Sequence, residues 1–579
     1  MADLVVRDLR FRYPGAAEPA LDGLDLTVSA GEVILVAGPS GCGKSTLALA
    51  LCGLVPARVP GRFSGSVQLD GAELQTLQPQ HVAQRVGMVF QDPSSQLITP
   101  TVENEVAFGP ENLGLPREVV AARVREALAM TGCQGLRSAA TTALSGGEKQ
   151  RVAIAATLAM HPEVLVLDEP CSDLDPAGAQ DVLAVLRQVN RERGMTVVLI
   201  EHRIDEVVPW VDRVLLLDRG RVVLDRPTRA AFRDTACWSD LGVGVPEMVR
   251  LGLLLPHLFP AGPPLSVAEA HQALAERPEA ALLVDPGRQA AEPVPRHCPP
   301  PLLAFEGVGV SYEKRAVLEG VDLTVKEGEW LALAGANGSG KTSLAELAMG
   351  FRAPTSGRVV LDGRRVDTSD VSRQIHRLAY LFQSADSMLF TATVEDELRF
   401  GLKHRRGRRT GSIRDGAGRL ESLLEITGLA DRRKANPFAL SAGQRQRLAI
   451  GALLVQAPHG LVLDEPTTGQ DEGHARAILG FLQELRDRER MTYLMISHDM
   501  RVIAAYATRM AVLADGKVAA VGPPAEVFAQ TDVLRRAHLV PPPVANLHAR
   551  LAGAPLRRVA LSVEELAHRL RPPVPAAAP

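Results

Sequence analysis

Two glycine-rich loops in this sequence each end in a lysine that is followed by a hydroxyl residue. They run from Gly38 to Ser45 and from Gly335 to Thr342, each after an apolar run and before an apolar helical pattern. The backbone N–H groups of such a loop can surround phosphate oxygens, the ammonium can reach terminal phosphates, and the hydroxyl can bind Mg²⁺. Both loops therefore predict a site for a nucleoside triphosphate and magnesium. The candidate loop residues are Gly38, Ser40, Gly41, Gly43, Lys44, Ser45 and Thr46 in the first loop, and Gly335, Asn337, Gly338, Gly340, Lys341, Thr342 and Ser343 in the second.

Two adjacent acidic residues end a buried-looking apolar run in each half of the chain. They are Asp168-Glu169 and Asp464-Glu465. Ligands of an α/β sheet bind where parallel strands end, so this is a place where carboxylates do chemistry. The first acid can hold Mg²⁺, and the second can orient and deprotonate an attacking water molecule.

A serine followed by small residues precedes a helical pattern in both halves, at Ser145-Gly146-Gly147-Glu148 and at 441–444. A serine with Glu or Gln three residues later predicts a capping box. Small residues in the first turn cost helix stability, but they leave the helix N-terminus open to an anion. The candidate residues here are Ser145, Gly146, Gly147, Glu148, Ser441, Gly443 and Gln444.

These motifs recur because the chain is a duplicated unit. Lys44 and Lys341 lie 297 residues apart, and the acid pairs keep almost the same spacing. Within each half, short unbroken apolar runs such as 33–36, 164–167 and 197–200 are typical of parallel strands buried on both faces. Helical patterns, for example 121–130 and 150–160, separate them, so each half is predicted to be α/β.

Composition narrows the function further. The formal net charge is -3 and aromatic residues make up 4% of the chain, so nucleic-acid binding is not expected. The six cysteines show no zinc or cluster spacing. No apolar run reaches the length of about 18 residues that a membrane span needs.

Together the motifs resemble those of the ATP-binding-cassette ATPases, twice over. The lysine loops resemble Walker A, the acid pairs Walker B, and the serine-glycine segments the signature of that family. Gln91 and Gln383 are similar to its Q-loop residue. His202 and His498 are similar to its switch histidine, and Tyr13 and Tyr312 to the aromatic residue that stacks on adenine.

The resemblance implies two tandem P-loop domains. Each would have a parallel-sheet core, an N-terminal antiparallel β subdomain, a helical signature subdomain and a short C-terminal helical extension. The expected boundaries are cassettes at 1–235 and 302–531, extensions at 236–284 and 532–579, and a proline-rich linker at 285–301.

In that family two cassettes pair head to tail, so each ATP would lie between one lysine loop and the other unit's signature. The resemblance implies catalysis by Glu169, His202, Glu465 and His498. It implies magnesium binding by Ser45, Gln91, Asp168, Thr342, Gln383 and Asp464, and nucleotide contacts by the loop, signature and tyrosine residues. Ala442 replaces a signature glycine and Glu148 replaces the usual glutamine. We therefore expect two competent but unequal sites.

The segments after the two glutamines, 91–109 and 383–401, resemble those of energy-coupling-factor importers for cobalt and vitamins. That branch implies a peripheral protein at the cytoplasmic membrane face, with a coupling subunit and a substrate-binding subunit as membrane partners. Acidic residues near the coupling groove would be Glu103, Glu105, Glu395 and Glu397. The basic run 403–409 is interpreted as a solvated insertion. The alternative is a soluble twin-cassette ATPase that acts on ribosomes.

Overall fold

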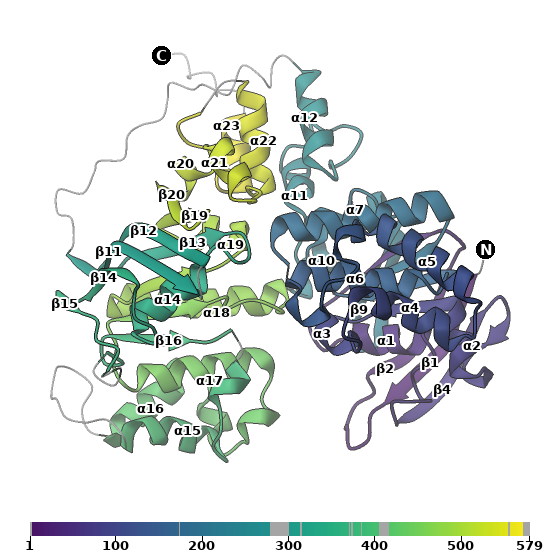
Figure 1. The fold of residues 1–579 in the computed structure, drawn as a ribbon, viewed down its shortest axis with the longest axis horizontal. Helices are drawn as coiled ribbons and strands as arrows, with labels where there is room; N and C mark the ends of the chain where they lie inside the picture. Colours follow the sequence, from purple (N-terminus) through teal and green to yellow (C-terminus); the bar gives the residue numbers. More distant parts are fainter. Residues whose placement is uncertain are drawn as a thin grey trace, which may run out of the picture. The chain divides into compact units, whose positions relative to one another are not determined.

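The computed structural model describes residues 3–172, 174–277, 300–312, 315–369, 371, 374–383, 385–403, 416–553 and 556–570 (Figure 1). The chain divides into two compact units, Met1–Pro278 and, apart from Asp471–Gly473, Glu279–Pro579. Most of the linker predicted at 285–301, and the basic run beyond Lys403, lie outside the described residues.

The first unit begins with a four-stranded antiparallel sheet. Its strand order is β2-β1-β4-β5, with β1 paired to both β2 and β4. Side chains of β1 alternate between buried and accessible positions, as expected for a sheet with one covered face. The bounds are β1 Leu4–Arg12, β2 Leu21–Val28, β4 Arg62–Leu69 and β5 Ala72–Glu73.

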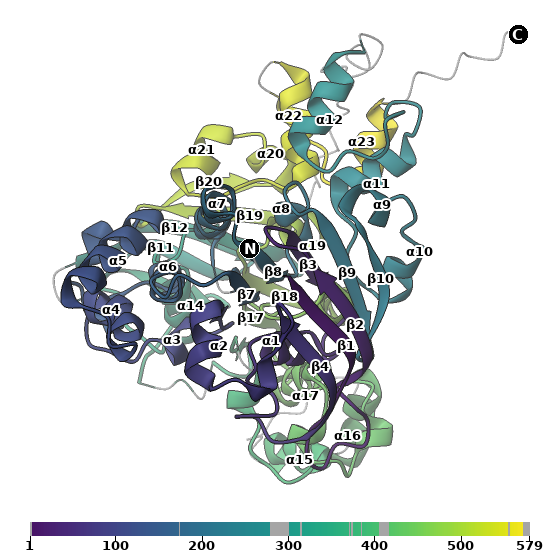
Figure 2. The same ribbon diagram turned by 90° about the vertical axis from the view of Figure 1, so that its right-hand side faces the viewer.

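A six-stranded sheet forms the centre of the first unit, in the order β10-β9-β3-β8-β7-β6. All pairs are parallel except the edge pair of β9 with β10, which Figure 2 shows side by side. The bounds are β3 Val33–Ala37, β6 Val86–Val89, β7 Val164–Asp168, β8 Thr196–Ile200, β9 Arg213–Asp218 and β10 Arg221–Pro227.

Strands β3, β7 and β8 are buried at every residue, which confirms the prediction from their unbroken apolar runs. Alternate residues pack on opposite sides. Ile34 and Val36 join the core that includes α1 (Lys44–Leu51), whereas Val33 and Leu35 join the core that includes α6 (Gly146–Leu158) and α7 (Pro176–Arg193).

Helices complete the first unit. Helices α4 (Val102–Asn112), α5 (Arg117–Met130) and α6 pack on one another and form the expected helical subdomain. The remaining helices are α2 Pro79–Arg85, α3 Pro93–Gln96, α8 Ile204–Val207, α9 Thr228–Ala231, α10 Ala236–Asp240, α11 Glu247–Leu254 and α12 Val267–Ala275.

The second unit repeats this architecture, which confirms the predicted duplication and fold class. Its antiparallel sheet has the order β12-β11-β14-β15 and its central sheet the order β16-β17-β18-β13-β19-β20. The strands are β11 Pro301–Tyr312, β12 Arg315–Lys326, β13 Trp330–Gly335, β14 Ser356–Leu361, β15 Arg364–Arg365, β16 Leu378–Leu381, β17 Gly460–Asp464, β18 Thr492–Ile496, β19 Arg509–Ala514 and β20 Lys517–Gly522. The helices are α14 Lys341–Met349, α15 Val394–Lys403, α16 Gly416–Ile426, α17 Ala442–Leu454, α18 Glu472–Glu489, α19 Met500–Tyr506, α20 Pro524–Val527, α21 Thr531–Arg536, α22 Pro543–Ala552 and α23 Val563–Leu570.

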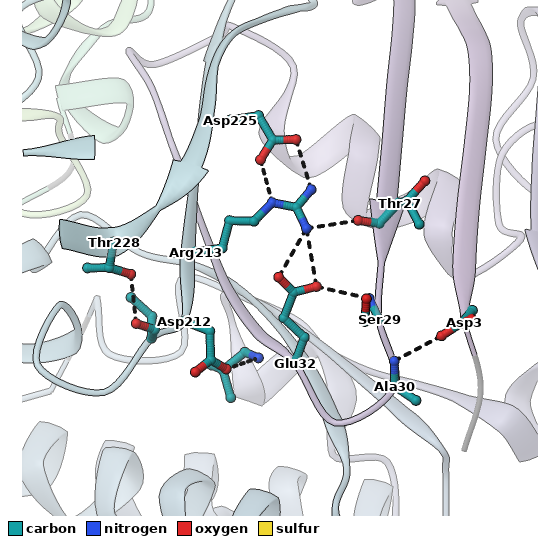
Figure 3. Close-up of polar contacts among 11 residues, drawn as sticks. Asp3, Thr27, Ser29, Ala30, Glu32, Asp212, Arg213, Asp225 and Thr228 are labelled. Carbon is teal, nitrogen blue, oxygen red and sulfur yellow. Dashed lines mark hydrogen bonds and ion pairs between the residues drawn. The ribbon is translucent and has the colours of Figure 1, made fainter. Parts of the chain in front are cut away.

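One arginine fastens the two sheets of the first unit to each other (Figure 3). Arg213, at the start of β9, forms an ion pair with Asp225 on β10 and lies 3.0 Å from Glu32, just before β3. It also donates a 3.0 Å hydrogen bond to the carbonyl of Thr27 on β2. Because β9 belongs to the central sheet and β2 to the antiparallel sheet, this cluster fixes one edge of both.

A buried histidine sits in the C-terminal helices of the second unit. His548, on α22, is 1% exposed, and its Nδ1 accepts a 2.8 Å hydrogen bond from the N–H of Ala560. Burial, helped by the charge of Arg569, lowers the pKa of His548 to about 4. The folded state therefore favours the neutral imidazole of His548.

This histidine makes the stability of the second unit depend on pH. Its pKa lies near 6.5 when unfolded, so its stabilisation is complete above that pH and is lost as pH falls from about 6.5 to about 4. The shift corresponds to about 3 kcal/mol. His548→Asn keeps an acceptor for Ala560 without titrating, so we expect a flatter pH profile of the unfolding free energy.

The measurement is denaturant unfolding between pH 7 and pH 4. Replacing Trp210 and Trp238 by Phe leaves Trp330 as the one tryptophan, and Trp330 is fully buried in the second unit. His81→Asn, at an exposed position of α2, is the control. Equal pH dependence in His548→Asn and the parent chain would contradict the prediction.

Candidate functional site

Both lysine loops lie where a central strand ends and a helix begins. The first joins β3 to α1 and the second joins β13 to α14. The last loop glycines are required by the backbone: Gly43 has φ 109° and Gly340 has φ 99°. A Cβ atom would lie 2.3 Å from the carbonyl oxygen of Ala20 at Gly43, and 2.5 Å from the Leu318 side chain at Gly340. The glycines therefore permit the tight turn that opens each helix.

The two loop lysines fold back into their own loops. Lys44 is 5% exposed and donates hydrogen bonds of 2.9 and 3.0 Å to the carbonyls of Gly38 and Pro39. Lys341 is 7% exposed and donates to the carbonyls of Gly335 and Ala336 at 2.8 and 2.9 Å. Each buried ammonium is thus held by carbonyl groups at the start of its own loop.

Asp168 ends β7 beside the first lysine loop and is 7% exposed. Burial raises its pKa, while a hydrogen bond with Ser45 and the charge of Lys44 oppose that shift. Its Oδ1 is buried and has no hydrogen-bond partner among the residues that the structure describes. A carboxylate oxygen without a partner next to a hydroxyl is a donor set that suits Mg²⁺.

No group of three His, Cys, Asp or Glu side chains in the described part of the chain could hold a metal by itself. A magnesium ion at this site would therefore depend on one carboxylate, one hydroxyl, the side-chain amide of Gln91, phosphate oxygens and water. Such a mixed set is usual for Mg²⁺ in nucleotide sites.

Glu169 follows Asp168 and contacts two other candidate residues. Its Oε1 lies 2.8 Å from Nε2 of His202, and its Oε2 accepts a 3.0 Å hydrogen bond from the amide of Gln91. Its backbone is left-handed (φ 49°), and its N–H donates to the carbonyl of Ile200 on β8. The structure thus brings together three residues that are far apart in the sequence.

The second unit holds Glu465 differently. Its Oε1 lies 3.0 Å from Nδ1 of His498, and its Oε2 accepts a 2.8 Å hydrogen bond from Thr468. Burial acts to raise the pKa of Glu465, but the bonds from His498 and Thr468 prevail and lower it. Gln383 is exposed and makes no contact with Glu465 in the described part of the chain, unlike Gln91 with Glu169.

Tyr380 was missed by the sequence analysis. On β16 and 6% exposed, it donates a 2.6 Å hydrogen bond to Oδ2 of Asp464. Burial raises the pKa of Asp464, and this bond opposes the rise. At the aligned position the first unit has Met88. Comparing the two halves position by position would have drawn attention to this phenol.

The serine-glycine segments form the predicted capping boxes at the starts of α6 and α17. The Glu148 carboxylate accepts the backbone N–H of Ser145 at 2.8 Å, and Gln444 accepts that of Ser441 at 3.0 Å. The bonds from Ser145 lower the pKa of Glu148. Its negative charge is thus fixed at a helix N-terminus, where the second unit has a neutral amide.

Each candidate tyrosine is tethered to the helix that carries the lysine. The hydroxyl of Tyr13 lies 3.1 Å from that of Thr46, and the hydroxyl of Tyr312 lies 3.0 Å from that of Ser343. Both rings therefore lie beside the first turn of α1 or α14.

The acidic residues expected near a docking groove have structural contacts. Glu105 is 5% exposed and accepts the N–H groups of Ile98 and Thr99, and Glu397 is 3% exposed and does the same for Phe390 and Thr391. In addition, Glu103 pairs with Arg137 and Glu395 with Arg433. Glu105 and Glu397 hold the preceding loops in shape and are too buried to form a docking surface.

Comparison with known proteins agrees with this arrangement. The profile of the family described as "ABC transporter" matches residues 21–172 and 318–468. A putative ABC transporter ATP-binding protein of Methanosarcina acetivorans is 41% identical over 575 residues, covering 96% of this chain and 91% of that protein. YkoD of Bacillus subtilis, a putative HMP/thiamine import ATP-binding protein, is 33% identical over 543 residues, covering 93% of this chain and 95% of that protein. The solved structure of cbiO1 from Clostridium perfringens, described as part of the ABC transporter complex cbiONQ, is 33% identical and covers 43% of this chain and 97% of its own, with a TM-score of 0.37.

The contact between Tyr380 and Asp464 can be tested by removing one hydroxyl. Tyr380→Phe leaves a buried carboxylate oxygen without its donor, which should lower the unfolding free energy of the second unit by about 1–3 kcal/mol. Trp330 fluorescence during denaturant unfolding measures the change. Met88→Leu, at the aligned position of the first unit, should leave this transition in place. An unchanged transition in Tyr380→Phe would show that the hydroxyl does not help to hold Asp464.

Proposed function

This chain belongs to the ABC transporter family, as an ATP-binding subunit, and from that premise we propose that it is the motor of an energy-coupling-factor importer. It hydrolyses ATP and drives uptake of a vitamin or metal ion through separate membrane subunits. The single observation that carries the hydrolytic part is the convergence of Gln91 and His202 on the two oxygens of Glu169.

ATP binds at each lysine loop in this proposal. The backbone N–H groups and Lys44 or Lys341 hold the phosphates, and Tyr13 or Tyr312 stacks on the adenine. The residues that hold Mg²⁺ are Ser45, Gln91 and Asp168 in the first unit, and Thr342, Gln383 and Asp464 in the second. When bound, the ion neutralises charge on the terminal phosphates.

Glu169 and Glu465 orient the attacking water molecule and accept its proton. Each is held on one oxygen by a histidine, His202 or His498, and by a second donor on the other. A carboxylate fixed at both oxygens keeps one orientation, so its position as a base does not depend on side-chain rotation. The lowered pKa of Glu465 keeps its carboxylate in the ionised form that a base requires.

The two units pair head to tail in this proposal. Each triphosphate lies between one lysine loop and the other unit's signature helix, whose N-terminus completes the charge stabilisation. One site combines the first loop with Ser441, Gly443 and Gln444. The other combines the second loop with Ser145, Gly146, Gly147 and Glu148. Because Glu148 places a negative charge where Gln444 is neutral, the two sites have unequal electrostatics.

Docking on membrane subunits is supported by a surface feature that recurs in both units. Ile98 is 65% exposed and Phe108 43%; the aligned residues Phe390 and Phe400 are 62% and 45% exposed. The rings of Phe390 and Phe400 pack edge to face at 4.8 Å. An exposed apolar pair held in place by a buried glutamate suits contact with an apolar partner segment.

The importer class is supported by similarity to YkoD, whose name refers to HMP/thiamine import. No helix in the described segments has both the length and the apolar character needed to cross a bilayer. In the proposal, transport uses separate membrane-embedded partners, a coupling subunit and a substrate-binding subunit. The chain then works at the cytoplasmic face of the membrane as a peripheral subunit.

Removing either proposed base tests hydrolysis at two sites. Glu169→Gln and Glu465→Gln should each lower ATP turnover by at least about half, and the double variant by about a hundredfold or more. Nucleotide binding should persist, because the lysine loops are unchanged. Phosphate release measures turnover, and Glu192→Gln, on an exposed face of α7, is the control. Full turnover in either single variant would refute the two-site proposal.

Charging the apolar surface tests docking. We expect Ile98→Asp combined with Phe390→Asp to prevent co-purification with the proposed membrane subunits, while ATP binding is retained. Val223→Asp, at a residue of β10 that is 48% exposed, is the matched control. Capture of the membrane proteins by the double variant would exclude this surface. Recovery of the wild-type chain with ribosomes instead would favour the alternative of a soluble ribosome-associated ATPase.

A further inference from the structure

The proposed adenine-stacking tyrosine of the second unit has a cation against its ring. The guanidinium carbon of Arg352 lies 4.3 Å from the centroid of the Tyr312 ring. Arg352 belongs to the turn between α14 and β14. At that distance the positive charge is attracted to the negative face of the aromatic ring.

Both partners are anchored to the same helix. Nε of Arg352 donates a 3.1 Å hydrogen bond to Oε2 of Glu346, and the Tyr312 hydroxyl lies 3.0 Å from that of Ser343. Ser343 and Glu346 are three residues apart on α14, so they share one face of the helix. The ring is therefore held at its hydroxyl end by Ser343 and on its face by the Arg352–Glu346 ion pair.

Among the residues that the structure describes, the first unit has no such arrangement. The residues aligned with Glu346 and Arg352 are Leu49 and Val55, counted from the two loop lysines. Tyr13 instead packs edge to face with Phe11, with the ring centroids 4.9 Å apart. The two proposed base-stacking rings are thus supported by different chemistry.

Tyr312 remains partly exposed beside Arg352. The residue is 36% exposed, although Arg352 covers one side of the ring. An aromatic ring has two faces, and a purine can stack on the side opposite a guanidinium. The Tyr312 ring is already held at its hydroxyl and on one face. It therefore loses little further conformational entropy when an adenine stacks on its second face.

We propose that Arg352, held by Glu346, is a positioning residue that presents the free face of Tyr312 to the adenine at the second lysine loop. The inference rests on the proposed ATP binding at that loop and deepens it. In this inference, binding of the adenine at the second loop depends on Arg352, whereas binding of the phosphates does not. The first loop has no equivalent dependence.

The test measures the contribution of the adenine to binding separately from that of the phosphates. In the full-length chain carrying Lys44→Ala, which silences the first loop, calorimetry measures binding of adenylyl imidodiphosphate and of inorganic tripolyphosphate with Mg²⁺. Arg352→Val installs the first unit's residue. It should weaken binding of the nucleotide about two- to tenfold and leave tripolyphosphate unchanged. Arg352→Lys keeps the charge and should recover part of the loss, whereas Glu346→Leu should reproduce part of it.

Arg364→Val, at an exposed residue of β15, is the matched control and should change neither affinity. An equal loss for both ligands would overturn the inference, because Arg352 would then act on the phosphates or on the fold. Unchanged nucleotide binding would overturn it, and so would tighter binding, which would mean that Arg352 blocks the stacking face. If the parent second loop bound neither ligand, the proposed ATP site itself would fail, which differs from failure of Arg352 alone.

Discussion

Burial of the central strands on both faces decides where polar chemistry can occur in this protein. Strands β3, β7 and β8 are apolar at nearly every position because helices cover one side and the antiparallel sheet and α1 cover the other. Polar groups are tolerated only where these strands end. Asp168, the last residue of β7, is the first that can carry a charge, and Glu169 turns out of the sheet behind it. The lysine loop, Asp168, Glu169 and His202 therefore lie together at the carboxyl edge of the central sheet.

The same scaffold appears twice, but the groups around the two acid pairs differ. Asp464 accepts a hydrogen bond from the phenol of Tyr380 on β16, whereas the first unit has Met88 at the aligned position. Glu169 is held by an amide from the Q-loop and Glu465 by a threonine three residues later. The two sites thus differ in the groups that hold their carboxylates, although the fold around them is the same.

Most of the fold and of the candidate site was predictable from local sequence patterns. The lysine loops, the buried strands and the capping boxes each depend on residues within one short segment, so spacing alone locates them. The Tyr380–Asp464 bond joins residues 84 apart, and the contact of Arg352 with Tyr312 joins the turn before β14 to the end of β11. Such contacts depend on packing that no local pattern records. Glu105, expected near the coupling groove, is another residue whose contacts no local pattern records: its buried carboxylate accepts the N–H groups of Ile98 and Thr99.

Arg213 gives the first unit a property that the nucleotide site alone would not suggest. The guanidinium fastens the antiparallel sheet to the central sheet at the end of β9 farthest from the lysine loop. At the opposite end, next to the lysine loop, Arg221 on β10 pairs with Asp22 on β2 at 2.6 Å, and the N–H of Asp22 donates a 2.9 Å hydrogen bond to the carbonyl of Gly220. Cross-links at both ends oppose hinging between the two sheets, so Tyr13 is carried on a sheet that is braced against the one that bears the loop.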